Sequence, residues 1–301
     1  MTSTANVPRV SVNQSIDDRN DLVAHGTVYD DVKYPYVIMV RGIAHTCTGS
    51  LIQPLFVLTA AHCSWQMAAK DMKVYRGHVS KSWRNPDLKR DVQVIHQHEG
   101  YTPSTQTPDI SLLEVYSRIT TKRMTSEWKG FDSFAVIGGT PEEFANDRTI
   151  NCVVIGFGQR ELQQVAKSDG YQTEVVTGHG PNACAQPWAI DGWQKFLCAQ
   201  PNKQMVCQGD SGGPMICNDK LYGSVKDGYN YKYNNDTVCG DPDVQTRHIF
   251  LYYYREWIDN QINGDSYDDY YDNTPTNRQY FTIVAFFAIL SLSGQVVFYS
   301  I

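Results

Sequence analysis

The sequence predicts an all-β protein whose clearest helix lies near the carboxyl end. The first observation is a series of short runs rich in β-branched and aromatic residues, each bounded by turn residues, which is typical of strands. The second is the regular spacing of these runs, which favours a barrel or a sandwich of strands. The third is that the clearest helical pattern occupies one segment, FLYYYREWIDNQI at 250–262.

The strand-like runs occur in two regions of the chain. Between about residues 23 and 153 they include YPYVIMV at 34–40 and PLFVLTA at 54–60. Between about residues 150 and 248 they include CVVIGFG at 152–158 and KLYGSVKDG at 220–228. The predicted helix is closed by Asn263 and Gly264, since glycine commonly ends a helix.

The two ends of the chain differ in composition from the part between them. Residues 1–22 are polar and lack the apolar core of a signal peptide, so we interpret them as a propeptide or amino-terminal extension. If the protein is secreted, as its cysteines indicate below, the lack of a signal peptide needs an explanation. Either the gene start is truncated or mis-called, which is the interpretation we favour, or export uses another route. Residues 264–279 are acidic and polar, which predicts a linker. Residues 280–301 carry no charged side chain, which predicts a transmembrane helix or the removed tail of a lipid-anchor signal.

Charge and cysteine content narrow the class of protein. The net charge of −6 argues against the broad basic surface of a nucleic-acid-binding protein. The eight cysteines form no C-x-x-C pair, so disulfides in a secreted protein are favoured over a zinc site. Eight cysteines allow 105 pairings, and their spacing alone does not choose one. The sequons at Asn13 and Asn235 add weak support for a secreted glycoprotein.

Three stretches together indicate nucleophilic catalysis. LTAAHC at 58–63 carries His62, TPDISLLEV at 107–115 carries Asp109, and GDSGGP at 209–214 carries Ser211. A serine hydroxyl is a weak nucleophile at neutral pH, so it needs a base, and the base needs a carboxylate that holds it in the correct tautomer. The backbone N–H groups of Gly209 and Ser211 are candidate donors to an oxyanion.

With these motifs in this order, residues 23–263 resemble the chymotrypsin (trypsin-like) serine protease family. The resemblance implies two antiparallel six-stranded Greek-key barrels packed together, with a C-terminal helix. It implies a serine endopeptidase that acts through an acyl-enzyme on protein or peptide substrates, and that protein protease inhibitors also bind. No metal, other cofactor or nucleic acid is expected. The implied location is secreted or extracellular, with anchoring at the cell surface if residues 280–301 are kept.

The resemblance also implies the disulfide pairing and the mode of activation. The implied bridges are Cys47–Cys63, Cys152–Cys217, Cys184–Cys198 and Cys207–Cys239. Family members are made as zymogens, and cleavage here would free an amino group at Val23 that pairs with Asp210. The residue before Val23 is Leu22 rather than Arg or Lys, so a tryptic activator is doubtful.

The predicted substrate pocket departs from the family pattern. Met205 lies six residues before Ser211, where trypsin-like members have an aspartate, so a hydrophobic or broad preference is favoured. Asp243 replaces a pocket-wall glycine, which leaves a preference for basic side chains open.

The wall segment, Lys226 to Gly228, departs as well. Lys226 replaces a serine that supports the triad carboxylate in the family, so it would either compete with His62 for Asp109 or turn to solvent beside Asp227. A catalytically silent homologue that binds partners is the alternative function. It is disfavoured because all three triad residues are present.

Overall fold

The computed structural model describes residues 23–43, 45–78, 85, 88–116, 133–158, 169–185, 192–232 and 237–264. The amino-terminal segment 1–22, both sequons, the linker beyond Gly264 and the apolar segment 280–301 lie outside the described residues. The chain forms two compact units, residues 1–253 and 254–301. Within the described ranges, no helix combines the length and the apolar character needed to span a membrane.

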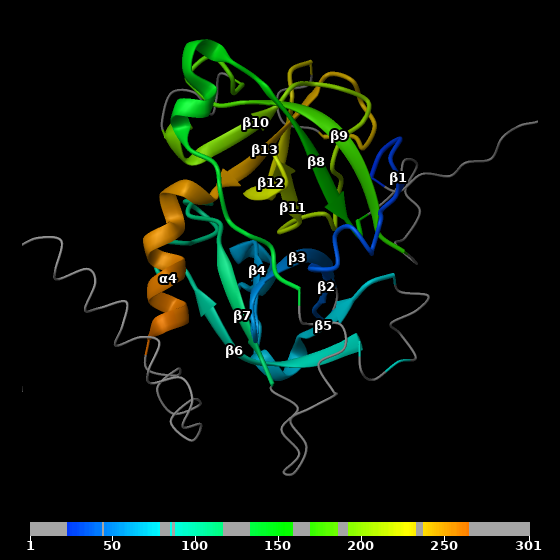
Figure 1. The fold of residues 1–301 in the computed structure, drawn as a ribbon, viewed down its shortest axis with the longest axis vertical. Helices are drawn as coiled ribbons and strands as arrows, with labels where there is room; N and C mark the ends of the chain where they lie inside the picture. Colours follow the sequence, from blue (N-terminus) through cyan, green and yellow to red (C-terminus); the bar gives the residue numbers. More distant parts are fainter. Residues whose placement is uncertain are drawn as a thin grey trace, which may run out of the picture. The chain divides into compact units, whose positions relative to one another are not determined.

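Six antiparallel strands close into a first barrel, in the order β2-β3-β4-β7-β6-β5 (Figure 1). The strands are β2 (Val37–Arg41), β3 (Thr46–Gln53), β4 (Phe56–Thr59), β5 (Lys73–Arg76), β6 (Lys89–Gln97) and β7 (Ser111–Val115). Buried aliphatic side chains, among them Ile38, Leu51 and Leu113, fill this barrel. The closed order satisfies the edges of the sheet, which would otherwise be open to another chain.

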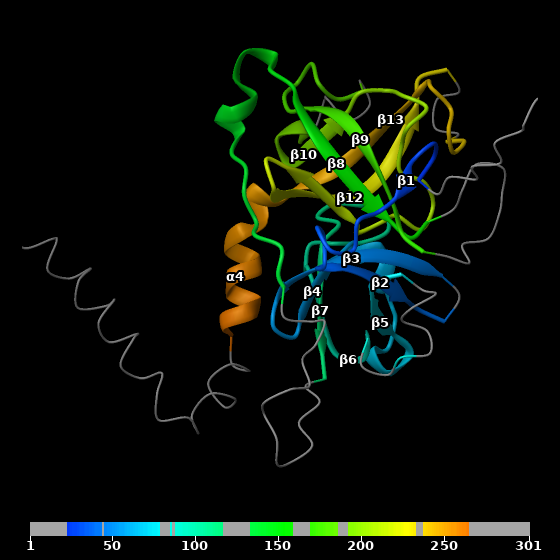
Figure 2. The same ribbon diagram turned by 45° about the vertical axis from the view of Figure 1, so that its right-hand side comes forward.

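Six further antiparallel strands form a second barrel, in the order β9-β10-β13-β12-β11-β8, closed by pairing of β8 with β9 (Figure 2). The strands are β8 (Ile150–Gly156), β9 (Tyr171–Gly178), β10 (Phe196–Ala199), β11 (Pro214–Cys217), β12 (Lys220–Asn230) and β13 (Val244–Phe250). The short strand β1 (Thr27–Val28) adds to β9 outside the barrel. The predicted architecture of two six-stranded barrels is therefore confirmed.

The helical segments are short. They are α1 (Ala61–Ser64), η1 (Ala69–Asp71), η3 (Pro141–Asp147), η5 (Trp193–Lys195), η6 (Leu251–Tyr254) and α4 (Arg255–Asn263). The C-terminal helix α4 is present, but it begins later than the predicted 250–262. Phe250 instead pairs with Gly223 as the last residue of β13, because tertiary pairing overrides the local helical pattern.

The two barrels share a buried cluster, which explains why residues 37–40 of β2 are apolar without interruption. In β2, Ile38 faces the core of the first barrel, whereas Val37 and Met39 pack with Ile155 and Ile216 of the second. Side chains of a strand alternate between its two faces, so burial of both faces requires an apolar residue at every position. The candidate site lies along the same junction between the barrels.

Candidate active site

The pairing of β4 with β7 brings His62 and Asp109 together. His62 lies in α1 directly after β4, and Asp109 lies just before β7. The Asp109 carboxylate accepts a hydrogen bond from the His62 backbone N–H through Oδ1 at 2.9 Å, and its Oδ2 lies 2.7 Å from His62 Nδ1. The Asp109 side chain is 3% exposed and that of His62 is 36% exposed. A buried carboxylate therefore orients a partly exposed imidazole.

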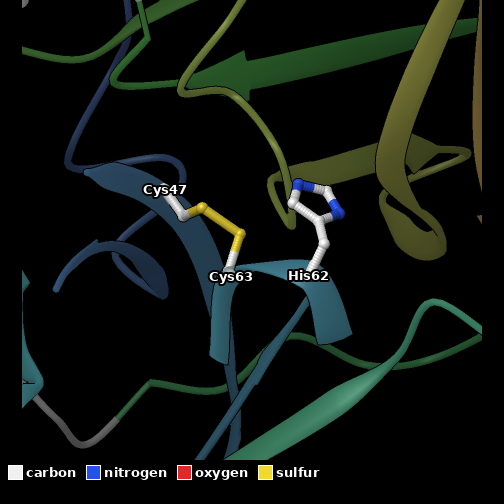
Figure 3. Close-up of side chains that lie close together, drawn as sticks. All are labelled: Cys47, His62 and Cys63. Atoms are coloured by element: carbon white, nitrogen blue, oxygen red, sulfur yellow. A yellow bond between two sulfur atoms is a disulfide. The ribbon is translucent and has the colours of Figure 1, made fainter. Parts of the chain in front are cut away.

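Ser211 enters the same site from the loop before β11. The Thr48 backbone N–H donates to the Ser211 carbonyl at 2.8 Å, which attaches this loop to β3 of the first barrel. Cys63 Sγ lies 3.8 Å from that carbonyl oxygen. Figure 3 shows the His62 imidazole beside the Cys47–Cys63 disulfide, with a ring nitrogen and both sulfurs within 4.8 Å of one another. Among the described residues, no hydrogen bond joins the Ser211 hydroxyl to His62.

Cys47, His62 and Cys63 are also a set of three potential metal ligands. Metals bind the cysteine thiolate, and both sulfurs here are tied in a disulfide. The set is therefore unsuited to a metal ion. All eight cysteines are bridged, in the pairing that the family resemblance implies.

The backbone around Ser211 leaves two N–H donors unused. The N–H groups of Asp210, Gly212 and Gly213 donate to backbone carbonyls. Those of Gly209 and Ser211 have no acceptor within the part of the chain that the structure describes. Gly209 has φ of +100°, and a Cβ there would lie 2.7 Å from Gly158 Cα, so only glycine fits. Most backbone N–H groups in folded proteins are paired, so two free donors beside a hydroxyl suit an oxyanion.

Asp210 is fully buried beneath this loop. Its Oδ1 accepts from the Gly158 N–H and its Oδ2 from the Cys207 N–H, both at 2.7 Å. Burial raises the pKa of the Asp210 carboxyl to about 7, although the two backbone hydrogen bonds lower it. No cation contacts this carboxylate among the described residues. Among the described residues, Asp210 is thus a buried acid without a counter-charge.

The predicted activation segment is already buried in the uncut chain. Val23 and Ala24 have no exposed surface, and Ala24 forms an isolated bridge with Met205. The chain just before β1 therefore lies against the strand-like segment that carries the predicted base of the pocket.

The fit around Asp210 predicts the effect of one added methyl group. A Cβ at Gly156, the last residue of β8, would lie 2.0 Å from Asp210 Oδ1. Because two hydrogen bonds hold that carboxylate, Gly156→Ala is expected to lower the free energy of unfolding by about 3 kcal/mol or more. Gly178→Ala, at the end of the paired strand β9, is the control, since its nearest neighbour lies at 3.0 Å. Urea unfolding measures both variants, and equal losses would contradict the prediction.

Of the predicted pocket residues, Met205 and Gly228 lie around Val244. Met205 is 4% exposed and packs with Ala24, Val244 and the Cys207–Cys239 disulfide. A Cβ on Gly228 would lie 3.2 Å from Val244 Cγ1. Asp243 is exposed at the surface instead, and its carbonyl accepts from the Tyr231 N–H. The base of the candidate pocket is therefore apolar.

Lys226 follows the second alternative that the sequence left open only in part. Its ammonium donates to the Asp227 carboxylate rather than competing for Asp109, as that alternative had it, but its side chain is buried rather than turned to solvent. A bulge between Val225 and Asp227 in β12 re-aims these neighbouring side chains. Among the described residues, the hydrogen bonds that Asp109 accepts come from His62 alone.

Sequence reasoning missed the second cation of this group. Arg247 of β13 lies opposite Asp227 and donates to both of its carboxylate oxygens, at 2.8 and 2.6 Å. Burial by itself would raise the pKa of Asp227, but the Arg247 guanidinium and the Lys226 ammonium hold it below its usual value. Only the register of β12 against β13, which the sequence does not reveal, brings these residues together.

Comparisons with known proteins agree with this geometry. The family model described as Trypsin matches residues 24–258. Trypsin epsilon of Drosophila erecta is 27% identical over 230 residues, covering 75% of this chain and 82% of the relative. Trypsin alpha-4 of Lucilia cuprina is 29% identical, covering 67% of this chain and 75% of the relative. Trypsin of Sarcophaga bullata is 28% identical, covering 69% and 80% respectively.

Proposed function

The chain belongs to the trypsin family of serine proteases, and from this premise we propose that it is an active endopeptidase with residues 23–263 as its protease domain. Ser211 attacks the peptide carbonyl and forms the acyl-enzyme. His62 takes the serine proton and returns it to the leaving amine, while Asp109 holds the imidazole in the required tautomer. The N–H groups of Gly209 and Ser211 stabilise the oxyanion.

One observation carries this proposal more than the others. The buried carboxylate of Asp109 orients the partly exposed imidazole of His62, and both this imidazole and the carbonyl of Ser211 lie beside the Cys47–Cys63 disulfide. A silent homologue has no need to keep a fully buried, oriented carboxylate, since such a group is costly to desolvate. The absent Ser211–His62 hydrogen bond is compatible with catalysis, because these bonds often tighten only when substrate binds.

The substrate is proposed to bind as an added strand along β12. The pairing of β11 with β12 ends at Ser224, whereas β13 continues to pair with β12 as far as Asn230. The edge at Lys226 to Gly228 therefore has no strand partner among the described residues, and an extended peptide can complete it. This edge follows the segment at Val225, which is hydrogen-bonded to Gly212 and Gly213 next to Ser211.

The apolar base of the pocket supports a hydrophobic or broad preference over a basic one. Met205 offers no charge to a lysine or arginine side chain, and the Asp243 carboxylate is at the surface. The chain is further proposed to be a secreted zymogen that is cut before Val23 and is open to protein inhibitors. Four disulfides fit an oxidising compartment.

Labelling with a fluorophosphonate probe tests the proposed activity. The full chain is allowed to mature, its new amino terminus is sequenced, and the probe is added with and without prior heat denaturation. An active protease is labelled only when folded and also hydrolyses peptides from a library. A mature, folded protein that neither reacts with the probe nor cleaves any peptide would instead be the silent homologue.

The proposed preference predicts the effect of a charge at the base of the pocket. Met205→Asp is expected to shift cleavage toward lysine and arginine and to lower the free energy of unfolding by about 1–3 kcal/mol, since it buries a carboxylate among apolar groups. Asp243→Asn is the control and is expected to leave the cleavage profile unchanged. A wild-type preference for basic residues that disappears in Asp243→Asn would show that Asp243, not Met205, sets specificity.

A further inference from the structure

We propose that a pair of buried hydroxyl groups, Ser64 and Ser111, positions the base and the acid of the candidate triad; this inference rests on the proposed function. Ser64 lies two residues after His62, at the end of α1. Ser111 lies two residues after Asp109, at the start of β7. Ser64 Oγ and Ser111 Oγ are 2.9 Å apart. This hydrogen bond thus links the two segments that carry His62 and Asp109, in addition to the hydrogen bonds between these two residues themselves.

The direction of this link follows from the acceptors around it. Each hydroxyl has one proton to donate. Ser111 Oγ lies 3.2 Å from the His96 carbonyl, an acceptor only, so Ser111 donates to His96 and accepts from Ser64. The other acceptors near Ser64 Oγ are more distant, namely Ala61 O at 3.2 Å and Gln97 Oε1 at 3.5 Å. The result is a chain of two donations from α1 through β7 to β6.

Burial gives the link its energetic weight. Ser64 is 1% exposed and Ser111 is 0% exposed, so water does not replace a partner that is removed. A buried polar group that loses its partner costs about 1–3 kcal/mol. The Ser64–Ser111 pair is therefore a specific polar contact in the otherwise largely apolar core of the first barrel.

In this chain, the segments that carry His62 and Asp109 need such a link to hold them in place. The helix α1 has four residues and no side-chain cap at its amino end, and a helix of one turn is not stable by itself. The Cys47–Cys63 disulfide holds α1 on one side. Asp109 accepts no described hydrogen bond except those from His62, because the Lys226 ammonium is directed to Asp227. The Ser64–Ser111 bond is the remaining side-chain link between α1 and β7 in the described structure.

The test separates positioning from binding and from general stability. The matured full chain is compared as wild type, Ser64→Ala, Ser111→Ala and the double variant, with the maximal rate kinact and the half-saturation constant KI measured for fluorophosphonate labelling. Each single variant is expected to lose about tenfold in kinact with KI unchanged, since small misplacements of catalytic groups are costly. The double variant is expected to lose no more than a single one, because both act through one bond.

Two further variants serve as controls. Ser50→Ala removes another buried hydroxyl of the first barrel, one with no hydrogen-bond partner among the described residues, and is expected to retain wild-type kinact. Ser111→Thr keeps the hydroxyl in a strand that accepts a β-branched residue, and is expected to recover most of the lost rate.

The outcomes distinguish this inference from the proposed function. A wild-type protein that is never labelled would end the proposed function. A labelled wild type with Ser64→Ala and Ser111→Ala at full kinact would end the inference alone. Independent, additive losses, or no recovery in a Ser111→Thr variant that keeps the wild-type free energy of unfolding, would likewise reject positioning through the shared bond.

Discussion

Ser211→Ala is expected to lower kcat for peptide hydrolysis by about 10⁴-fold or more and to abolish fluorophosphonate labelling, with the fold intact. The serine oxygen is the atom that bonds to the carbonyl carbon, and alanine offers no replacement for it. The remaining rate would come from substrate binding and from the backbone N–H groups at positions 209 and 211, which have no acceptor among the described residues and persist without the hydroxyl. Steady-state kinetics of peptide hydrolysis, with the concentration of the matured chain determined by absorbance, measures this loss.

A second substitution, at the proposed base His62, tests whether His62 and Ser211 act together. His62→Ala is expected to cost a similar factor, and the Ser211→Ala/His62→Ala double variant is expected to cost no more than either change alone. Groups that act as one device are not additive, since the proton acceptor is useless without the nucleophile. Ser224→Ala, a buried hydroxyl with no described partner, is the control and should keep full activity. If the loss of kcat in the double variant equalled the product of the two single losses, the two residues would contribute separately.

The strand-rich class was predictable because its signals are local, whereas the two six-stranded barrels were implied by the family resemblance. The four runs named from the sequence overlap β2, β4, β8 and β12, and the boundaries moved where the chain turns. The run at 34–40, for example, begins as β2 only at Val37, since residues 35 and 36 lie in a turn and Pro35 has no N–H to donate to a ladder. The three chemical motifs were likewise local, because a nucleophile, a base and an acid each need a particular residue type.

The supporting groups of the site were not predictable, because they depend on register between strands. Arg247 meets Asp227 only because β12 and β13 pair with a bulge at that point. Ser64 meets Ser111 only because β4 and β7 pair so that Thr59 lies opposite Ser111. Serine and arginine have many ordinary surface roles, so neither residue type signals burial by itself.

Asp210→Asn is expected to change the stability of the uncut chain with opposite signs at low and high pH. The folded-state pKa of Asp210, about 7, lies above the value of about 3.9 for an unfolded aspartate. The folded wild type therefore holds a proton that the unfolded chain has released, so its stability is highest below pH 4 and falls as pH rises to 7, by about 4 kcal/mol. Asparagine does not ionise, so the variant lacks this fall.

At low pH the variant is expected to be less stable by about 1 kcal/mol. Asparagine has one accepting oxygen in place of two, and its amide nitrogen only donates, so either the Gly158 or the Cys207 N–H group loses its acceptor. Above pH 7 it is expected to be more stable than wild type, by roughly 3 kcal/mol after the same loss is counted. Urea unfolding in a Ser211→Ala background, which prevents self-digestion, measures both limits. If the free energies of unfolding of wild type and variant changed in parallel across pH 4–8, Asp210 would not be a buried, unpaired carboxyl.

The same substitution is expected to act in the other direction on the matured enzyme. The proposed cleavage before Val23 would supply an ammonium group that pairs with ionised Asp210, and removing one partner of a buried ion pair costs about 3–5 kcal/mol. Because asparagine offers no charge to that ammonium, kcat/KM of the cleaved variant is expected to fall by roughly 10²-fold. The expected variant has a higher free energy of unfolding than wild type before cleavage and a lower kcat/KM after it. Both effects together are explained only if proteolysis supplies the positive charge that pairs with the Asp210 carboxylate. Full activity in cleaved Asp210→Asn would show that the loop around Ser211 needs no such pair.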